Sequence, residues 1–238
     1  EIIGRLVGSE MCIRDSADNA LDVQEFMIMP VGAASFSDGL RMGAEIFQAL
    51  KSELSNKGLS TAVGDEGGFA PAINTTPEAV EVVASSVEAA GYHLGDDVVL
   101  ALDAAASEFF QDSSYDLQGE GRKLDTAGMV DMWAALCDQY PIVSVEDPLD
   151  EDDWQGFVDL TERIGQGVQI VGDDLFVTNP ERLGKGIKMK AGNAILIKVN
   201  QIGTLTETMK AISDAKQAGF GVVISCLLYT SPSPRDDR

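Results

Sequence analysis

The stretch Pro141-Ile-Val-Ser-Val-Glu-Asp147 is a short β-branched run followed at once by two acids. A continuous apolar run of this length is typical of a strand that is covered on both faces. Similar runs occur elsewhere in the chain, at Asp97–Leu102, Val168–Val171, Ala194–Val199 and Phe220–Ile224. Longer segments with helical spacing separate them, so the pattern predicts repeated strand-helix units and a parallel sheet.

The segments between the runs carry helix signals. Apolar residues spaced by three or four predict one buried stripe on each of two helices, Leu40, Ala44, Phe47, Leu50 and Leu54 on the first and Val80, Val83, Val87 and Ala90 on the second. Thr76-Pro77-Glu78 and Thr178-Asn179-Pro180-Glu181 place a capping residue before a first-turn proline. Gly58, Gly91 and Gly219 fit helix ends.

Strand-helix units form either a closed barrel or an open, doubly wound sheet, and periodicity alone does not choose between them. No candidate strand is followed by the Gly-x-Gly-x-x-Gly pattern that binds dinucleotide phosphates. The fold class that we expect is therefore α/β, with a TIM-like β/α barrel.

The chain is strongly acidic. Of its 238 residues 39 are acidic and 17 basic, which gives a formal charge of −22. Such a field repels nucleic acid and anionic membranes, so we expect neither as a partner. An acidic protein that handles an anionic substrate needs metal cations or a few basic residues at its site. The absence of a long apolar run and of a secretory signal predicts no membrane span and a cytosolic protein.

Acidic residues follow several of the predicted strands. Asp103, Glu146 and Asp173 each stand at or just after the end of an apolar run. Glu146 and Asp173 are the first residues of two acidic doublets, Glu146-Asp147 and Asp173-Asp174. In a parallel barrel these strand ends open on one rim, where active sites of this architecture lie. Oxygen ligands suit Mg2+, although a single acid at such a place could merely cap the next helix.

Lys198 stands in an otherwise apolar run, where an unpaired ammonium is costly to bury. It could form a structural ion pair with one of the acids, or a Schiff base with a substrate. It could also act as a general base, with a pKa lowered by burial and by a nearby metal ion.

Other candidates are less distinctive on their own. Val63-Gly-Asp-Glu-Gly-Gly-Phe-Ala-Pro71 is a glycine-rich loop that could bring Glu66 to a ligand, or could be an acidic turn. Gln24-Glu25 precedes an apolar run and is by itself a polar pair at the start of a strand. His93, the only histidine, is expected to be structural, and Cys137 to be a buried thiol.

Several of these segments resemble motifs of the enolase family, closest to its bacterial-type members. They occur in family order and the resemblance covers essentially all of residues 17–225: Asp22-Val-Gln-Glu-Phe-Met-Ile-Met-Pro-Val-Gly32, Val63–Pro71, Ser144-Val-Glu-Asp-Pro148, Gly172-Asp-Asp-Leu-Phe-Val-Thr-Asn179 and Leu196-Ile-Lys-Val-Asn-Gln-Ile-Gly-Thr204.

The resemblance implies a lyase that uses Mg2+ to dehydrate 2-phosphoglycerate to phosphoenolpyruvate in glycolysis. It makes Asp103, Glu146 and Asp173 the metal ligands and Lys198 the base that removes the C2 proton. Glu66 becomes the acid that assists loss of the C3 hydroxyl. Gln24 and Glu25, with Lys198, contact the substrate.

The resemblance also implies a cytoplasmic homo-oligomer, a dimer or larger, in a family whose members occur at the cell surface as well. Two other functions stay open at this point. One is a superfamily enzyme that acts on a non-phosphorylated carboxylate acid. The other is an enolase-like barrel with a surface or partner-binding role and no turnover.

The two ends of the chain depart from the family pattern. Residues 1–16 and 226–238 continue neither strand nor helix spacing and resemble translated sequencing-adapter sequence, so we expect a partial barrel domain at 17–225 between foreign ends. Native flexible termini are the alternative. After Val222-Val-Ile-Ser225 the family has His-Arg-Ser-Gly, which contacts the substrate, and this chain has Cys226-Leu-Leu-Tyr. The family's N-terminal domain, with a serine ligand for a second Mg2+, has no counterpart here.

These departures predict that the polypeptide as printed does not turn over. Substrate contacts that the family requires are missing, and an open barrel exposes sheet edges. An assay of the 238-residue chain with Mg2+ and 2-phosphoglycerate should detect no phosphoenolpyruvate. Measurable product would contradict the prediction.

Overall fold

A computed structural model describes residues 21–64 and 67–225 of the chain. Its main element is a six-stranded sheet in which β1 runs antiparallel to β2 and all other neighbours are parallel. In spatial order the strands are β1 (Glu25–Met29), β2 (Val99–Asp103), β6 (Ile142–Glu146), β7 (Gln169–Gly172), β8 (Ala194–Ile197) and β9 (Gly221–Ile224). The five predicted apolar runs are all strands of this sheet, each shifted by no more than two residues.

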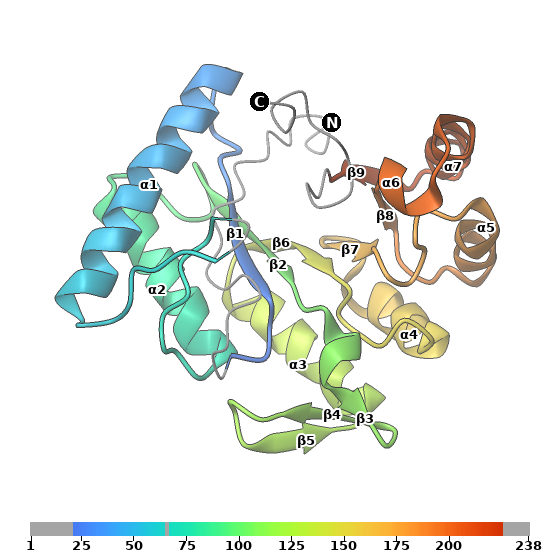
Figure 1. The fold of residues 1–238 in the computed structure, drawn as a ribbon, viewed down its shortest axis with the longest axis horizontal. Coiled ribbons are helices and arrows are strands. Elements are labelled where there is room, and N and C mark those ends of the chain that lie inside the picture. Colours follow the sequence, from blue (N-terminus) through green and yellow to red (C-terminus); the bar gives the residue numbers. More distant parts are fainter. Residues whose placement is uncertain (1–20, 65–66, 226–238) are drawn as a thin grey trace, which may run out of the picture.

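The sheet curls, and helices cover its outer side (Figure 1). One or two helices lie between each pair of consecutive parallel strands: α3 (Thr126–Gln139), α4 (Trp154–Ile164), α5 (Pro180–Met189), the short α6 (Val199–Ile202) and α7 (Leu205–Gln217). A curled parallel sheet with outer helices is the architecture of a β/α barrel. The described strands make an incomplete barrel, so the predicted fold class is confirmed.

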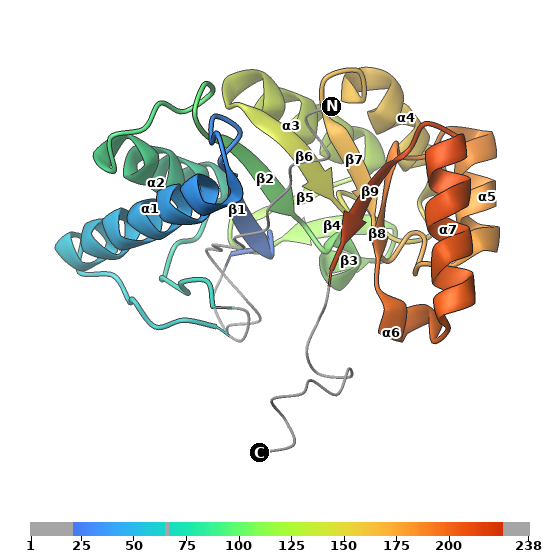
Figure 2. The same cartoon turned by 90° about the horizontal axis from the view of Figure 1, so that it is seen from above.

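Two elements depart from simple strand-helix alternation. β1 is followed by the helix pair α1 (Phe36–Asn56) and α2 (Thr76–Ala89), which pack on each other and lie on one side of the sheet (Figure 2). A separate antiparallel sheet of β3 (Phe110–Gln111), β4 (Ser114–Leu117) and β5 (Arg122–Leu124), preceded by the short 3-10 helix η2 (Ala106–Phe109), is inserted between β2 and α3.

The buried face of α1 differs from the prediction. Leu40 is 52% exposed and Ala44 is exposed, whereas Met42 and Ile46 are buried together with Leu50. Apolar residues lie on more than one face of this helix, and its contact with α2 selects the face through Met42 and Ile46. The stripe predicted for the second helix is correct at Val80, Val83 and Val87, which are all buried, while Ala90 is the half-buried C-cap of α2.

Helix ends follow the predicted chemistry with one shift. The N-cap of α2 is Thr75, whose hydroxyl accepts the N–H of Glu78 at 3.4 Å, so Thr76 is already inside the helix. Asn179 caps α5 as expected, because its side-chain oxygen accepts the N–H groups of Glu181 and Arg182. The glycines at 58, 91 and 219 have φ of 70°, 88° and 78°, the left-handed conformation that glycine adopts at a helix end.

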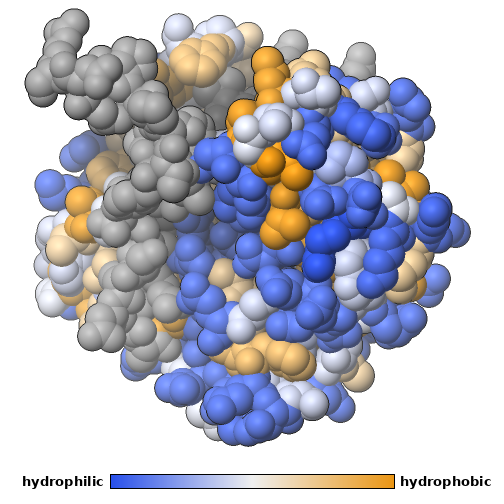
Figure 3. Space-filling model, turned by 45° about the vertical axis from the view of Figure 1, so that its right-hand side comes forward, coloured by the Kyte–Doolittle hydropathy of each residue, from blue (hydrophilic) through white to orange (hydrophobic). Residues whose placement is uncertain are grey.

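The surface is mostly hydrophilic, as the charge requires, and Figure 3 shows a narrow strip of hydrophobic side chains on one face. Exposed apolar residues of α6, α7 and β9 include Val199, Leu205, Met209 and Ile224. β1 and β9 form the two edges of the described sheet. Among the described residues no helix is long and apolar enough to cross a bilayer.

The core between the sheet and its outer helices should dominate stability. Phe157 of α4 is fully buried, and replacing it with alanine should lower the free energy of unfolding by about 3–5 kcal/mol. Phe36, which is 62% exposed, is the matched control, and Phe36→Ala should change stability by less than about 0.5 kcal/mol. Urea unfolding of both variants measures the difference; equal losses would show that the core does not lie where the fold places it.

Candidate active site

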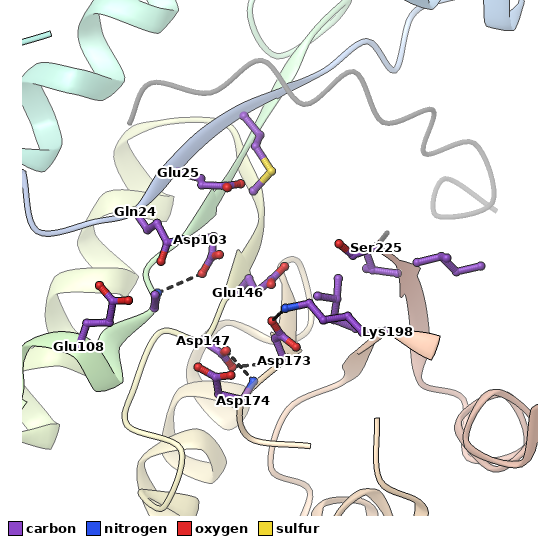
Figure 4. Close-up of a pocket in the computed structure, with 15 residues that line it drawn as sticks. Gln24, Glu25, Asp103, Glu108, Glu146, Asp147, Asp173, Asp174, Lys198 and Ser225 are labelled. Carbon is purple, nitrogen blue, oxygen red and sulfur yellow. Dashed lines mark hydrogen bonds and ion pairs between the residues drawn. The ribbon is translucent and has the colours of Figure 1, made fainter. Parts of the chain in front are cut away.

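A cavity of about 270 Å3 opens at the carboxyl ends of the parallel strands. Figure 4 shows that its polar side chains come from successive strand ends and point toward one another. The polar residues that line it are Gln24, Glu25, Asp103, Glu108, Glu146, Asp147, Asp173, Asp174, Lys198 and Ser225. Most of these side chains are acidic, and Lys198 is the only cation among the described residues that line the cavity.

Strand register aligns three of the acids. Glu25 pairs with Asp103 across β1 and β2, and Asp103 pairs with Glu146 across β2 and β6. Paired residues of neighbouring strands project to the same face of a sheet. Backbone hydrogen bonding therefore brings these carboxyl groups into one row, against their electrostatic repulsion.

Asp173 and Lys198 complete the group from the next two strands. Asp173 follows Gly172, the last residue of β7, and Lys198 follows Ile197, the last residue of β8. The prediction that Lys198 stands within the strand is wrong by one residue: the strand ends before it, and Lys198 is the N-cap of α6. Lys198 Nζ donates to Asp173 Oδ2, and the two side chains are only 14% and 9% exposed.

The backbone at Lys198 is held from a neighbouring loop. Its N–H donates to the hydroxyl of Thr178 at 2.8 Å, and Thr178 is fully buried. Thr178 and the preceding Val177 both have positive φ, 55° and 43°, which is rare for β-branched residues. The strained turn after β7 therefore supports the start of α6, where the lysine stands.

Burial dominates the electrostatics of the acids. It raises the pKa of Asp103 to about 7, against an N–H donated by Ala105 that acts to lower it. Burial also raises the pKa of Glu146 well above its usual range, with the charges of Asp103 and Asp147 adding to the effect. The pKa of Asp173 is raised by burial as well, although Lys198 acts in the opposite direction.

Two opposing effects set the pKa of Lys198. Burial acts to lower the pKa of Lys198, as predicted, but the charge and hydrogen bond of Asp173 and the charge of Glu146 outweigh it, so that its pKa is raised. Coulomb attraction between an ammonium and a carboxylate in a partly buried site exceeds the desolvation of the amine here.

The donor set fits a hard divalent cation. Asp173 Oδ1 is buried and has no hydrogen-bond partner in the described residues, which is costly for a carboxylate oxygen. Carboxylate oxygens from Asp147, Asp173 and Asp174 all lie within 4.8 Å of one another. Mg2+ and similar ions take such oxygen ligands, and a cation would relieve the repulsion among these carboxylates.

The structure brings together most of the residues singled out from the sequence. Gln24, Glu25, Asp103, Glu146, Asp173 and Lys198 all line the cavity, and Glu25 is buried. Glu66 lies outside the described residues, so its place stays a prediction. The foreign origin of residues 1–16 and 226–238 and the role of each site residue also stay predictions.

Sequence reasoning missed several residues of the site. It noted both acidic doublets but gave Asp147 and Asp174 no role, it used Thr178 only as part of a helix-capping signal, and it overlooked Glu108. The doublets were a usable signal, because both acids of each doublet stand at a strand end, where the cavity opens. Glu108 and Thr178 had none, since only tertiary contacts bring them near the strand ends.

Neither His93 nor Cys137 lines the cavity. The imidazole of His93 is 76% exposed and lies 3.8 Å from Glu88. Cys137 is half-buried on α3 rather than fully buried, and burial raises the pKa of its thiol to about 12.

Comparison with protein families agrees with this geometry. The model of the family described as enolase, C-terminal TIM barrel domain, matches residues 13–228. The chain belongs to this enolase family. Its curled sheet and outer helices are thus those of an enolase-type barrel domain, which is a domain of enzymes, and the acidic cavity lies at the end of the barrel where enzymes of this architecture act.

The raised carboxyl pKa values make stability depend on pH. The folded state binds more protons than the unfolded state between the unfolded pKa of Asp103, near 3.8, and its folded pKa of about 7. Stability must therefore fall as pH rises through this window. In EDTA the melting temperature should be higher at about pH 5 than at about pH 8, and excess Mg2+ should raise it more at the higher pH, where the carboxylates are charged.

Asp103→Asn is the control for this prediction. It removes one of the shifted carboxyl groups, so the difference between the two pH values should shrink. A melting temperature in EDTA that rises from about pH 5 to about pH 8 would contradict the assignment of buried carboxyl groups with raised pKa values to this cavity.

Proposed function

We propose that this domain is the catalytic barrel of a Mg2+-dependent phosphopyruvate hydratase, which dehydrates 2-phospho-D-glycerate to phosphoenolpyruvate. The observation that carries the proposal is the single lysine amine among carboxyl groups at successive strand ends. Family membership supports the reaction class, since enolase-type sites use a Lys or His base and Mg2+.

Removing a proton next to a carboxylate is difficult because negative charge builds up on a group that is already anionic. Bound Mg2+ would neutralise that charge, held by carboxylate oxygens of Asp103, Glu146 and Asp173. Asp103 and Glu146 are the last residues of β2 and β6, and Asp173 directly follows β7, so the sheet itself sets their separation.

Lys198 is the group that we assign to the proton at C2. In the described structure Lys198 Nζ donates to Asp173 Oδ2, which orients the amine toward the cavity and keeps it protonated. To act as a base the amine must first lose a proton, and a cation held at Asp173 Oδ1 would draw negative charge from that carboxylate and so weaken the ion pair that raises the pKa of Lys198. After the transfer the proton is on the Lys198 amine, and the ion pair with Asp173 stabilises the resulting ammonium group.

We assign the acid that assists loss of the C3 hydroxyl to Glu66 by its position in the glycine-rich loop motif. Gln24 and Glu25 are proposed to contact the substrate, and both line the cavity beside Asp103. A phosphorylated three-carbon acid is small enough for a cavity of about 270 Å3.

The cellular setting is proposed on the resemblance alone. We propose a bacterial-type glycolytic enzyme of the cytoplasm, whose parent protein forms a homodimer or a larger oligomer. The charge of −22 agrees with a protein that binds neither nucleic acid nor anionic membranes.

The test is an assay of residues 17–225 placed inside a complete enolase reading frame. It should form phosphoenolpyruvate with Mg2+ and lose activity with EDTA. Lys198→Met, which keeps the length of the side chain and removes the amine, should lower kcat by about 10²- to 10⁴-fold. The variant should still bind Mg2+, because the proposed ligands are intact.

Lys210→Met is the matched control. Lys210 lies on α7, where it is 61% exposed and pairs with Asp214, away from the cavity. It should leave kcat unchanged. Full activity of Lys198→Met, or product formation in EDTA, would refute the proposal.

A further inference from the structure

Asp147 is a buried acid of the cavity to which neither the motif resemblance nor the proposed reaction gives a role. It is 4% exposed and follows the last residue of β6. Its φ of 38° is in the left-handed region, which is unfavourable for a residue with a side chain. A buried acid in a strained conformation needs a structural or functional reason.

The backbone of Asp147 is tied to the strand on each side of it. Its N–H donates to the carbonyl of Val171 in β7 at 3.0 Å, and its carbonyl accepts the N–H of Ala106 after β2 at 3.1 Å. The next residue is Pro148, whose carbonyl accepts the indole N–H of the buried Trp133 at 2.9 Å. These contacts hold Asp147 between two other strand ends and maintain its unusual φ.

The carboxylate of Asp147 then holds the chain beyond β7. Its Oδ1 accepts the N–H of Asp173 at 3.0 Å, and its Oδ2 accepts the N–H of Asp174 at 2.8 Å. Figure 4 shows both contacts beneath the Lys198–Asp173 pair. Each oxygen thus takes one of two consecutive backbone donors, which fixes the peptide plane between Asp173 and Asp174.

The consequence is a defined direction for the side chain of Asp173. With its backbone held, one oxygen of Asp173 meets Lys198 and the other, Oδ1, is buried without a partner in the described residues. Outer contacts of this kind set the orientation of a ligand group and typically change metal affinity by about 10- to 100-fold when lost.

We propose that Asp147 is a positioning residue: its carboxylate holds the Asp173–Asp174 backbone so that Asp173 presents one oxygen to Lys198 and the other to a divalent cation. The inference deepens the proposed function and rests on it for the place of the cation. Asparagine cannot replace Asp147, because its amide offers one acceptor oxygen and turns an NH2 group against a backbone N–H.

The experiment compares Asp147→Asn with the wild-type chain in Mn2+ and Mg2+ binding, measured by calorimetry on the 238-residue protein. We expect affinity to fall by about 10- to 100-fold. NMR of the cation-free variant should show shifted amide signals for Asp173 and Asp174, since their shared acceptor has changed.

Asp125→Asn is the matched control. Asp125 also accepts a backbone N–H through its carboxylate, from Gly128 at 2.8 Å, but it caps α3 and does not line the cavity. A purely structural loss lowers the melting temperature of both variants without changing cation affinity. Loss of cation affinity in Asp147→Asn alone supports positioning.

Three outcomes overturn the inference. If Asp147→Asn folds and binds cations as tightly as the wild-type protein, Asp147 has no positioning role. Weakened binding with unchanged cation-free amide signals of Asp173 and Asp174 would make Asp147 a direct ligand instead. If the wild-type chain binds no divalent cation, both this inference and the proposed metal site are overturned. If the chain binds cations but residues 17–225 show no activity inside a complete enolase reading frame, only the proposed reaction is overturned.

If Asp147→Asn does not fold, NMR of the wild-type protein tests the inference instead. Couplings through the hydrogen bonds from the amides of Asp173 and Asp174 to the Asp147 carboxyl carbon should be present without cation and persist when Mg2+ is added. Their absence, or their loss on adding Mg2+, overturns the inference.

Discussion

The ion pair between Lys198 and Asp173 is the interaction on which the site depends, because it opposes a repulsion that the fold creates. Hydrogen bonding between strands places Glu25, Asp103 and Glu146 in one row, and burial raises the pKa values of Asp103 and Glu146. A single ammonium compensates part of that charge. The remaining imbalance makes the cavity favourable for a cation.

The same site shows how loops at strand ends are kept in place without regular secondary structure. Asp147 and Thr178 both have positive φ, both are buried, and each uses its side chain to hold the backbone of a neighbouring strand end. One supports the segment that carries Asp173 and the other supports the start of α6 at Lys198. Strain at two loop residues is thus balanced by hydrogen bonds that bring Asp173 and Lys198, which follow different strands, into contact.

Much of the fold followed from local pattern, and the errors have a common origin. Apolar runs predicted every parallel strand of the described sheet, because a strand covered on both faces needs apolar residues at consecutive positions. The buried face of α1 was predicted wrongly at Leu40 and Ala44, since its contact with α2 selects among several apolar faces. The small sheet β3-β4-β5 has strands of two to four residues, too short to give a periodic signal.

By itself the sequence determined the order of the parallel strands, the acidic character, and which acids stand at the ends of those strands. These properties depend on neighbours along the chain, where spacing and residue type are directly visible. Only the tertiary structure decided that Lys198 stands beyond its strand and pairs with Asp173, and that the pKa of Lys198 is raised. It also decided that the Asp147 carboxylate accepts the backbone N–H groups of Asp173 and Asp174. Those facts depend on distances and burial between residues far apart in the chain, which arise only when the sheet curls and brings its strand ends to one rim.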